Sequence, residues 1–247
     1  MIIFNFIAQQ TTRLIEQILP AQCLICALPS NSKLICLHCE KKILSKRNYC
    51  LHCALPLAKT TEYCGDCLNK DYRFEHVHAL GDYTKPLSTL IKQLKYQKQL
   101  IAGELLANLL VKSVLSRYTA SELAQFDFLL AVPLHNKKLT SRGFNQAQII
   151  CDSLHKQLQI PIITHQISRN RLTTPQEGLT IKQRQRNVEN AFVSNTRESY
   201  LLKDKNILVI DDVVTTGATT NSLCKTLLKQ QVNSITVWCV SRTALEK

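Results

Sequence analysis

Two adjacent aspartates near the C-terminus, Asp211 and Asp212, follow an aliphatic run and precede a stretch rich in hydroxyl groups. Like charges side by side are costly unless hydroxyl groups, cations or a metal ion satisfy them. Carboxylates at the carboxyl end of a parallel strand lie where open α/β sheets bind ligands. This arrangement predicts a site in which both aspartates hold the hydroxyl groups of a sugar.

The stretch after the aspartates leads directly into an expected helix. Its backbone N–H groups and the helix N-terminus form a cradle for an anion such as a phosphate, and Gly217 lets the backbone turn tightly beside the ligand. With the aspartates, this indicates a ribose-phosphate site; the alternative is an ordinary strand–turn–helix whose Thr and Asp side chains only cap the helix. The expected phosphate-binding residues are Thr215, Thr216, Gly217, Ala218 and Thr219.

Eight of the eleven cysteines form four Cys-x-x-Cys pairs in the first third of the chain. One such pair brings two thiolates to a metal from a single turn, and two pairs complete a closed tetrahedral zinc site. The spacing predicts one or two structural zinc ions, with neighbouring pairs as the simplest arrangement and an interleaved arrangement left open. His38 and His52 inside these pairs are expected to be exposed spacers. The expected zinc ligands are Cys23, Cys26, Cys36, Cys39, Cys50, Cys53, Cys64 and Cys67.

The chain of 247 residues carries a net charge of +13. That balance indicates anionic partners such as phosphates, nucleic acid or a membrane surface, although a solvated basic surface has the same composition. No secretory signal opens the chain, and no run reaches the ~18 apolar residues of a membrane-spanning helix. Many thiols without a secretory signal favour a reduced, cytoplasmic compartment. We therefore expect a cytoplasmic protein with no transmembrane segment.

Three regions are expected along the chain. Residues 1–20 form a helix that packs on its own protein, with anchorage at the inner face of the membrane as the alternative. Residues 21–70 form the cysteine-rich block, and residues 74–247 alternate strands with helices. This alternation predicts an α/β fold with a mostly parallel sheet and helices on both faces. The expected strands are 76–83, 126–133, 160–167 (interrupted by Pro161), 206–210 and 234–241, and the expected helices are 87–96, 101–118, 145–158 and 218–230.

The stretch 211–219 resembles the signature that binds 5-phosphoribosyl-1-pyrophosphate in type I phosphoribosyltransferases. Nearly the whole chain resembles the ComF family, whose members include ComFC competence proteins and GntX-like proteins. This resemblance implies a double zinc ribbon joined to a type I phosphoribosyltransferase-like domain, and a role in DNA uptake during natural transformation. It rests also on the cysteine pairs and on the motifs at 132–135, 142–146, 176–179, 184–187 and 191–192.

The resemblance also gives expected roles to basic residues. It places the pyrophosphate-holding loop after the strand that ends near Val132, where Lys137 and Lys138 supply cations and Arg142 lies just beyond. Solvated surface lysines are the alternative there. The basic segment 169–187 corresponds to a hood over the active site, and its side chains suit either the leaving diphosphate or single-stranded DNA phosphates. The cations expected in this segment are Arg171, Lys182, Arg184 and Arg186.

Two functions follow from the resemblance. In the first, the domain binds phosphoribosyl pyrophosphate with Mg²⁺, and Asp211 and Asp212 act as the catalytic residues of a glycosyl transfer to an unidentified acceptor. In the second, a non-catalytic protein binds ribose phosphate or single-stranded DNA and docks on the transformation machinery, with a competence helicase or a DNA-uptake channel protein as its partner.

Overall fold

The structure, a computed structural model, describes residues 21–30, 34–171, 190–195 and 199–244. The expected helix over 1–20 and the expected site residue Arg184 lie outside these ranges. The chain divides into two compact units, 1–45 and 46–247, so the boundary falls between the second and third cysteine pairs. The limits 21–70 and 74–247 expected from the sequence stay a prediction, because compactness alone does not define a domain.

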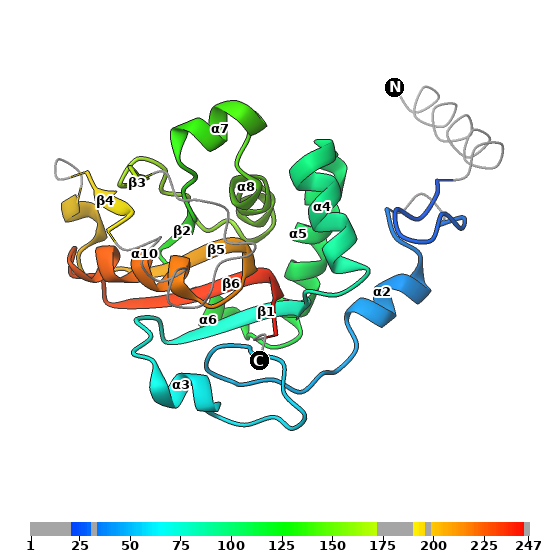
Figure 1. Ribbon diagram of the computed structural model, residues 1–247, viewed down its shortest axis with the longest axis horizontal. Helices are drawn as coiled ribbons and strands as arrows, with labels where there is room; N and C mark the ends of the chain where they lie inside the picture. The colour runs from blue at the N-terminus through cyan, green and yellow to red at the C-terminus, as the bar shows by residue number, and fades with distance from the viewer. Residues whose placement is uncertain (1–20, 31–33, 172–189, 196–198, 245–247) are drawn as a thin grey trace, which may run out of the picture. The chain divides into compact units, whose positions relative to one another are not determined.

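The core of unit 46–247 is a four-stranded sheet in the order β1-β6-β5-β2 (Figure 1). All three pairings are parallel, with His76 opposite Thr236 and Phe128 opposite Ile207 in the register. The parallel sheet predicted from the alternating strands and helices is therefore confirmed. The strands are β1 (His76–Asp82), β2 (Phe128–Ala131), β5 (Asn206–Val214) and β6 (Ser234–Arg242).

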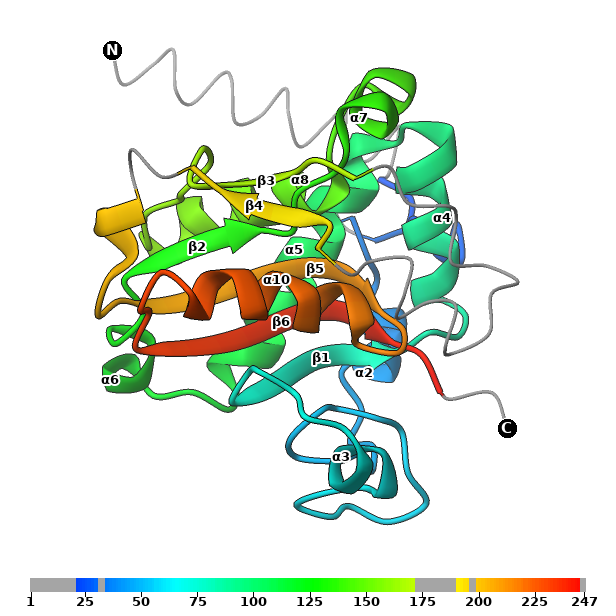
Figure 2. The same cartoon turned by 60° about the vertical axis from the view of Figure 1, so that its left-hand side comes forward.

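Helices cover both faces of this sheet, as expected. Figure 2 shows α10 lying along β5 and β6 on one face, with α5 on the other. Leu223 and Leu227 of α10 join the core with Val209 and Val237 of the sheet. Aliphatic side chains on both faces explain why the strands read as continuous apolar runs. The covering helices are α4 (Leu87–Gln97), α5 (Leu100–Leu115), α8 (Gln146–Leu158) and α10 (Ala218–Leu228).

The order of the strands creates a switch point between β5 and β2. From β2 the chain passes through α8 to Ile162, which bridges back to Leu129 of β2. From β5 it passes through α10 to β6, on the other side of β5. Where successive connections diverge in this way, a crevice opens outside the carboxyl ends of the two strands. The loops that follow β2 and β5 therefore flank the natural ligand position of this sheet.

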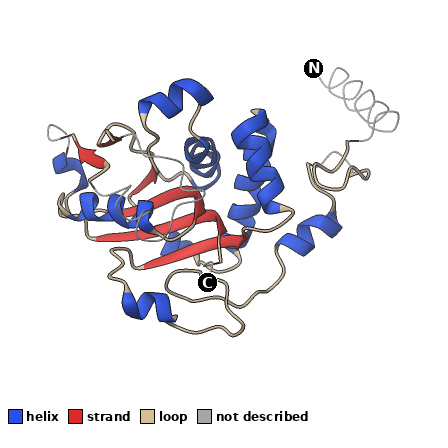
Figure 3. Cartoon of the chain, viewed as in Figure 1, coloured by secondary structure: helices blue, strands red, loops and turns tan. Residues whose placement is uncertain are grey.

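Two expectations about local structure were wrong. The strand expected at 160–167 reduces to a single bridge at Ile162, because Pro161 has no N–H for a ladder and offers only its carbonyl to the Leu129 N–H, at 2.7 Å. The lysines expected on a loop lie instead on helix α7 (Asn136–Arg142), which His135 caps through Nδ1. Figure 3 shows α7 as a helix.

Short elements complete the described structure. β3 (Ile167–Arg169) pairs antiparallel with β4 (Phe192–Ser194), which places Arg169 opposite Phe192. The others are α2 (Leu37–Ile43), α3 (Gly65–Asn69), α6 (Ala120–Leu123) and the 3₁₀ turn Ser199–Leu202. Within the described ranges, no helix combines the length and apolarity required to cross a bilayer.

Candidate functional site

The eight cysteines form two four-thiol clusters. Within each cluster all four sulfur atoms lie within 4.8 Å of one another. Neighbouring pairs therefore combine, and the interleaved alternative is excluded. A tetrahedral ion with Zn–S bonds of ~2.3 Å places its sulfurs about 3.8 Å apart. The measured Sγ–Sγ distances of 3.6 Å for Cys53–Cys64, 3.7 Å for Cys26–Cys36 and 3.8 Å for Cys50–Cys67 fit that geometry. Both clusters can hold a structural zinc ion.

The two clusters are built alike. The first pair of each lies in a tight turn, and the backbone N–H of the residue after the pair donates to the carbonyl of the first cysteine. That residue is Ala27 in one cluster and Ala54 in the other, with φ of 58° and 56°. The second pair of each lies at the start of a short helix, α2 or α3. The repeated geometry explains the duplicated spacing in the sequence.

The expectation that both histidines are exposed spacers holds only for His38. His52 is half-buried and its Nδ1 lies 3.3 Å from the Cys67 sulfur. Its ring stacks against Phe74 at a centroid distance of 5.4 Å, and Tyr63 and Tyr72 also contact it. Burial lowers the pKa of His52. His52 therefore packs beside the second cluster and is placed to hydrogen-bond one of its thiolates.

The two aspartates differ in their surroundings. β5 continues past them to Val214, so they lie within the strand and not at its end, and their carboxyl groups lie close enough to interact with each other. Asp212 is 8% exposed, and Lys95 Nζ of α4 lies 2.5 Å from its Oδ2. Asp211 keeps more exposed surface, and its Oδ1 accepts a hydrogen bond from the Asp212 N–H at 2.8 Å. Among the residues that the structure describes, Asp212 is thus paired with a cation, whereas no ion pair is formed by Asp211.

The electrostatics of the pair follow from this geometry. Desolvation, together with the charge of Asp212, raises the pKa of Asp211 from its usual 3.8 to about 8, while Lys95 opposes the shift. Desolvation lowers the pKa of Lys95, but attraction to Asp212 prevails and the net shift is upward. An aspartate that resists ionisation in this way is stabilised by a cation or by hydrogen-bond donors. A cation bound beside Asp211 would therefore favour its ionised form.

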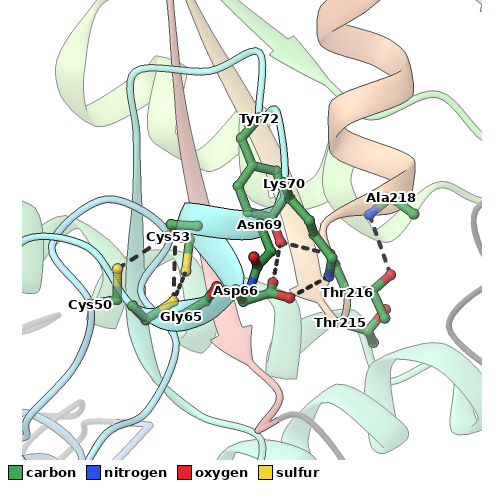
Figure 4. Close-up of polar contacts among 12 residues, drawn as sticks. Cys50, Cys53, Gly65, Asp66, Asn69, Lys70, Tyr72, Thr215, Thr216 and Ala218 are labelled. Atoms are coloured by element: carbon green, nitrogen blue, oxygen red, sulfur yellow. Dashed lines mark hydrogen bonds and ion pairs between the residues drawn. The ribbon is translucent and has the colours of Figure 1, made fainter.

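The loop after β5 has the expected shape. Gly217 adopts φ of +75° and caps α10, a conformation that favours glycine. Thr216 is 3% exposed, and its Oγ1 accepts a hydrogen bond from the Ala218 N–H at 3.4 Å (Figure 4). Thr215, Ala218 and Thr219 are partly exposed. The turn thus combines a helix N-terminus with partly exposed residues, as the phosphate hypothesis requires.

Cations from α7 and β3 lie close enough to interact with one another and, through Arg169, with Asp211. Burial lowers the pKa of Lys138, and the like charges of Arg169 and Arg142 lower it further. Burial lowers the pKa of Arg169 as well, and the charge of Asp211 opposes that shift. Arg142 Nη1 donates to Gln146 Oε1 at 2.5 Å. Lys138 and Arg142 therefore lie together as expected, whereas Lys137 is exposed.

Two residues near the aspartates, Lys95 and Arg169, were not predicted from the sequence as site residues. Lys95 follows Ile91 by one helical turn, so it belongs to the buried stripe of an amphipathic helix, where a lysine is a signal of a buried partner. Arg169 lay within the basic segment, but nothing in its spacing distinguished it from the surrounding cations. Both acquire their roles from residues distant in sequence.

Comparison with known proteins agrees with this architecture. The family profile described as double zinc ribbon domain matches residues 14–68, and that described as phosphoribosyl transferase domain matches residues 139–244. The chain is 34% identical over 211 residues to competence protein F of Haemophilus influenzae, covering 84% of this chain and 90% of that protein. It is 31% identical over 226 residues to DNA utilization protein YhgH of Escherichia coli K12, covering 91% and 98%.

Zinc content tests the two clusters separately. We expect the purified protein to hold two zinc ions per chain, and either Cys26→Ser or Cys67→Ser to lower this number to about one, because three thiolates retain a tetrahedral site poorly. Elemental analysis under reducing conditions measures the stoichiometry. A substitution that leaves two ions bound would remove that cluster from the assignment.

The raised pKa of Asp211 predicts a pH dependence of stability. The folded protein holds a proton on this carboxyl group that the unfolded chain releases above pH ~4, so the free energy of unfolding should fall as pH rises from about 4 to about 8. Asp211→Asn should remove this contribution and be more favourable, relative to the parent, at pH 8 than at pH 5. Urea unfolding at both pH values measures it. Equal effects at the two pH values would contradict the assignment.

Proposed function

The chain belongs to the ComF family of competence and DNA utilization proteins, with a double zinc ribbon and a type I phosphoribosyltransferase-like fold, and from this we propose that it binds phosphoribosyl pyrophosphate. The observation that carries the proposal is the position of Asp211. Its carboxyl group lies on β5 just before the glycine-containing turn, at the switch point of the sheet. A sugar hydroxyl and a phosphate are thereby offered complementary groups four to eight residues apart in the sequence, at Asp211 and at the turn 215–219.

Each part of the donor has a candidate partner. Asp211 would hold ribose hydroxyl groups, with Asp212 kept beside it by Lys95. The turn Thr215–Thr219 would hold the 5′-phosphate through its amides and hydroxyls. The cations of α7 and β3 would face the diphosphate. The residues suit Mg²⁺, since it binds through one or two carboxylates together with substrate phosphates. When bound, the ion would neutralise charge on the diphosphate oxygens.

Glycosyl transfer is the reaction that this arrangement could support. Asp211 and Asp212 would stabilise the positive charge that develops on the ribose ring as the bond to diphosphate breaks. The cationic cluster would stabilise the departing diphosphate. The names of the relatives support a biological setting in DNA uptake, and the chain would then work at the cytoplasmic side of the membrane on incoming single strands.

Calorimetry with phosphoribosyl pyrophosphate and Mg²⁺ tests donor binding. The double variant Asp211→Asn, Asp212→Asn should weaken donor binding at least roughly tenfold, because neutral amides lose the charge-assisted hydrogen bonds to the ribose. Asp204→Asn, at an exposed turn, makes the same chemical change elsewhere and should bind like the parent. Unchanged affinity in the double variant would refute the ribose assignment.

A second candidate function is non-catalytic binding of single-stranded DNA. An open groove of about 1050 Å³ runs along α10, lined by the segment 69–73 and by β4. Its lining carries four cations, and the half-buried Tyr72 offers a ring for base stacking. Asp71 is the one acidic residue of the lining, and it pairs with Arg73. The cations are Lys70, Arg73, Lys225 and Lys229.

The salt dependence of oligonucleotide binding tests the second function. The exposed side chains of Lys225 and Lys229 would each contact a phosphate. Replacing both by Gln should then reduce the slope of log affinity against log salt by about 1.4 for a single strand. Lys156→Gln, exposed on α8, is the control. Fluorescence anisotropy with a labelled oligothymidylate measures the slope, and an unchanged slope would exclude this groove as the binding surface.

A further inference from the structure

The segment that carries the second cysteine cluster packs against the turn after β5 and contacts its backbone (Figure 4). The Tyr72 hydroxyl shares its one proton between two acceptors, Asp66 Oδ2 at 2.6 Å and the Thr216 carbonyl oxygen at 3.1 Å. Asp66 stands between the cluster cysteines Cys64 and Cys67 at the start of α3. The Lys70 ammonium pairs with its other oxygen at 2.7 Å. The second Cys-x-x-Cys pair thus reaches the Thr216 peptide through one aspartate and one tyrosine.

The first pair of the same cluster reaches the adjacent peptide. The fully buried Arg242 donates through Nε to the Cys53 carbonyl at 3.0 Å. Its Nη1 donates to the Val214 carbonyl at 3.2 Å and to the Thr215 carbonyl. Both halves of the cluster therefore hold carbonyl oxygens of the turn after β5, by two independent routes.

The ring of Tyr72 also shapes the turn sterically. A Cβ atom added at Gly217 would lie 2.8 Å from Tyr72 Cε1. Gly217 is therefore required twice, once for its positive φ and once for the close approach of this ring. The ring and the hydroxyl of Tyr72 act on consecutive residues of the turn.

Holding these carbonyls determines where the amides point. In a planar trans peptide the C=O of one residue and the N–H of the next are directed oppositely. Anchoring the Thr215 and Thr216 carbonyls toward the cysteine cluster therefore directs the N–H groups of Thr216 and Gly217 away from it. Donors that are fixed before the ligand arrives bind more tightly, because no ordering cost remains.

We propose that the second cysteine cluster positions the anion-binding amides of the turn, so that zinc in this cluster, and not in the first, controls anion affinity there. Tyr72 and Arg242 are the positioning residues. The identity of the anion as a 5′-phosphate rests on the proposed function; the coupling between zinc and turn does not. The first cluster belongs to the other compact unit and supplies none of these contacts.

Hydrogen exchange of the full-length zinc-loaded protein tests the coupling without any ligand. Tyr72→Phe keeps the ring against Gly217 and removes only the hydroxyl. We expect faster amide exchange in the peptide spanning 214–221, an unchanged zinc content, and a roughly three- to tenfold loss of affinity for phosphoribosyl pyrophosphate. Tyr63→Phe removes an exposed hydroxyl from the same segment and should leave both readouts unchanged.

Variants that lose zinc from one cluster at a time provide a second test. Cys67→Ser should accelerate exchange at 214–221, whereas Cys26→Ser should lose the other ion without that effect. Equal exchange in the turn for Tyr72→Phe and parent would overturn the proposal, even if Cys67→Ser fails to fold. If the exchange responds as expected while the parent protein binds no donor, the coupling stands and the proposed function fails.

Discussion

The buried guanidinium group of Arg242 links the carboxyl ends of β5 and β6 to the second cysteine cluster. Arg242 is 0% exposed and donates to four backbone carbonyls, those of Cys53, Val214, Thr215 and Thr243. Taking a cation out of water costs several kcal/mol unless hydrogen bonds replace its hydration. The carbonyls that meet this requirement come from a cysteine pair, the end of β5 and the end of β6. Three segments must therefore converge for the charge to be tolerated, and the turn after β5 is one of them.

The two cysteine clusters share the same metal-binding chemistry but differ in their structural roles. Both use a turn with an alanine at positive φ and a short helix, and both have the sulfur geometry of a zinc site. In the first, the metal would replace the hydrophobic core that so small a unit lacks. In the second, Cys50, Cys53 and Cys64 join the main core beside the sheet. Duplication of a local motif has thus not fixed its role; the surroundings have.

Much of this molecule could be predicted from local patterns. Aliphatic runs identified the central strands because a parallel sheet buries both faces, and cysteine spacing identified the metal ligands because a knuckle needs only a few residues. Gly217 was recognisable because its turn needs a positive φ. The partners of these residues were not, since Lys95, Tyr72 and Arg242 act on segments far along the chain. Pro161 was visible in the sequence, yet its effect on the edge strand was underestimated.

The shared unit 46–247 has a consequence for modularity. A zinc ribbon and a sugar-phosphate-binding domain in one chain could be expected to fold as two independent modules. Yet a fragment beginning at residue 74 would lack the Cys53 carbonyl that accepts from Arg242 and the Tyr72 hydroxyl that meets the Thr216 carbonyl. The second ribbon could therefore change in evolution only together with the sheet it supports.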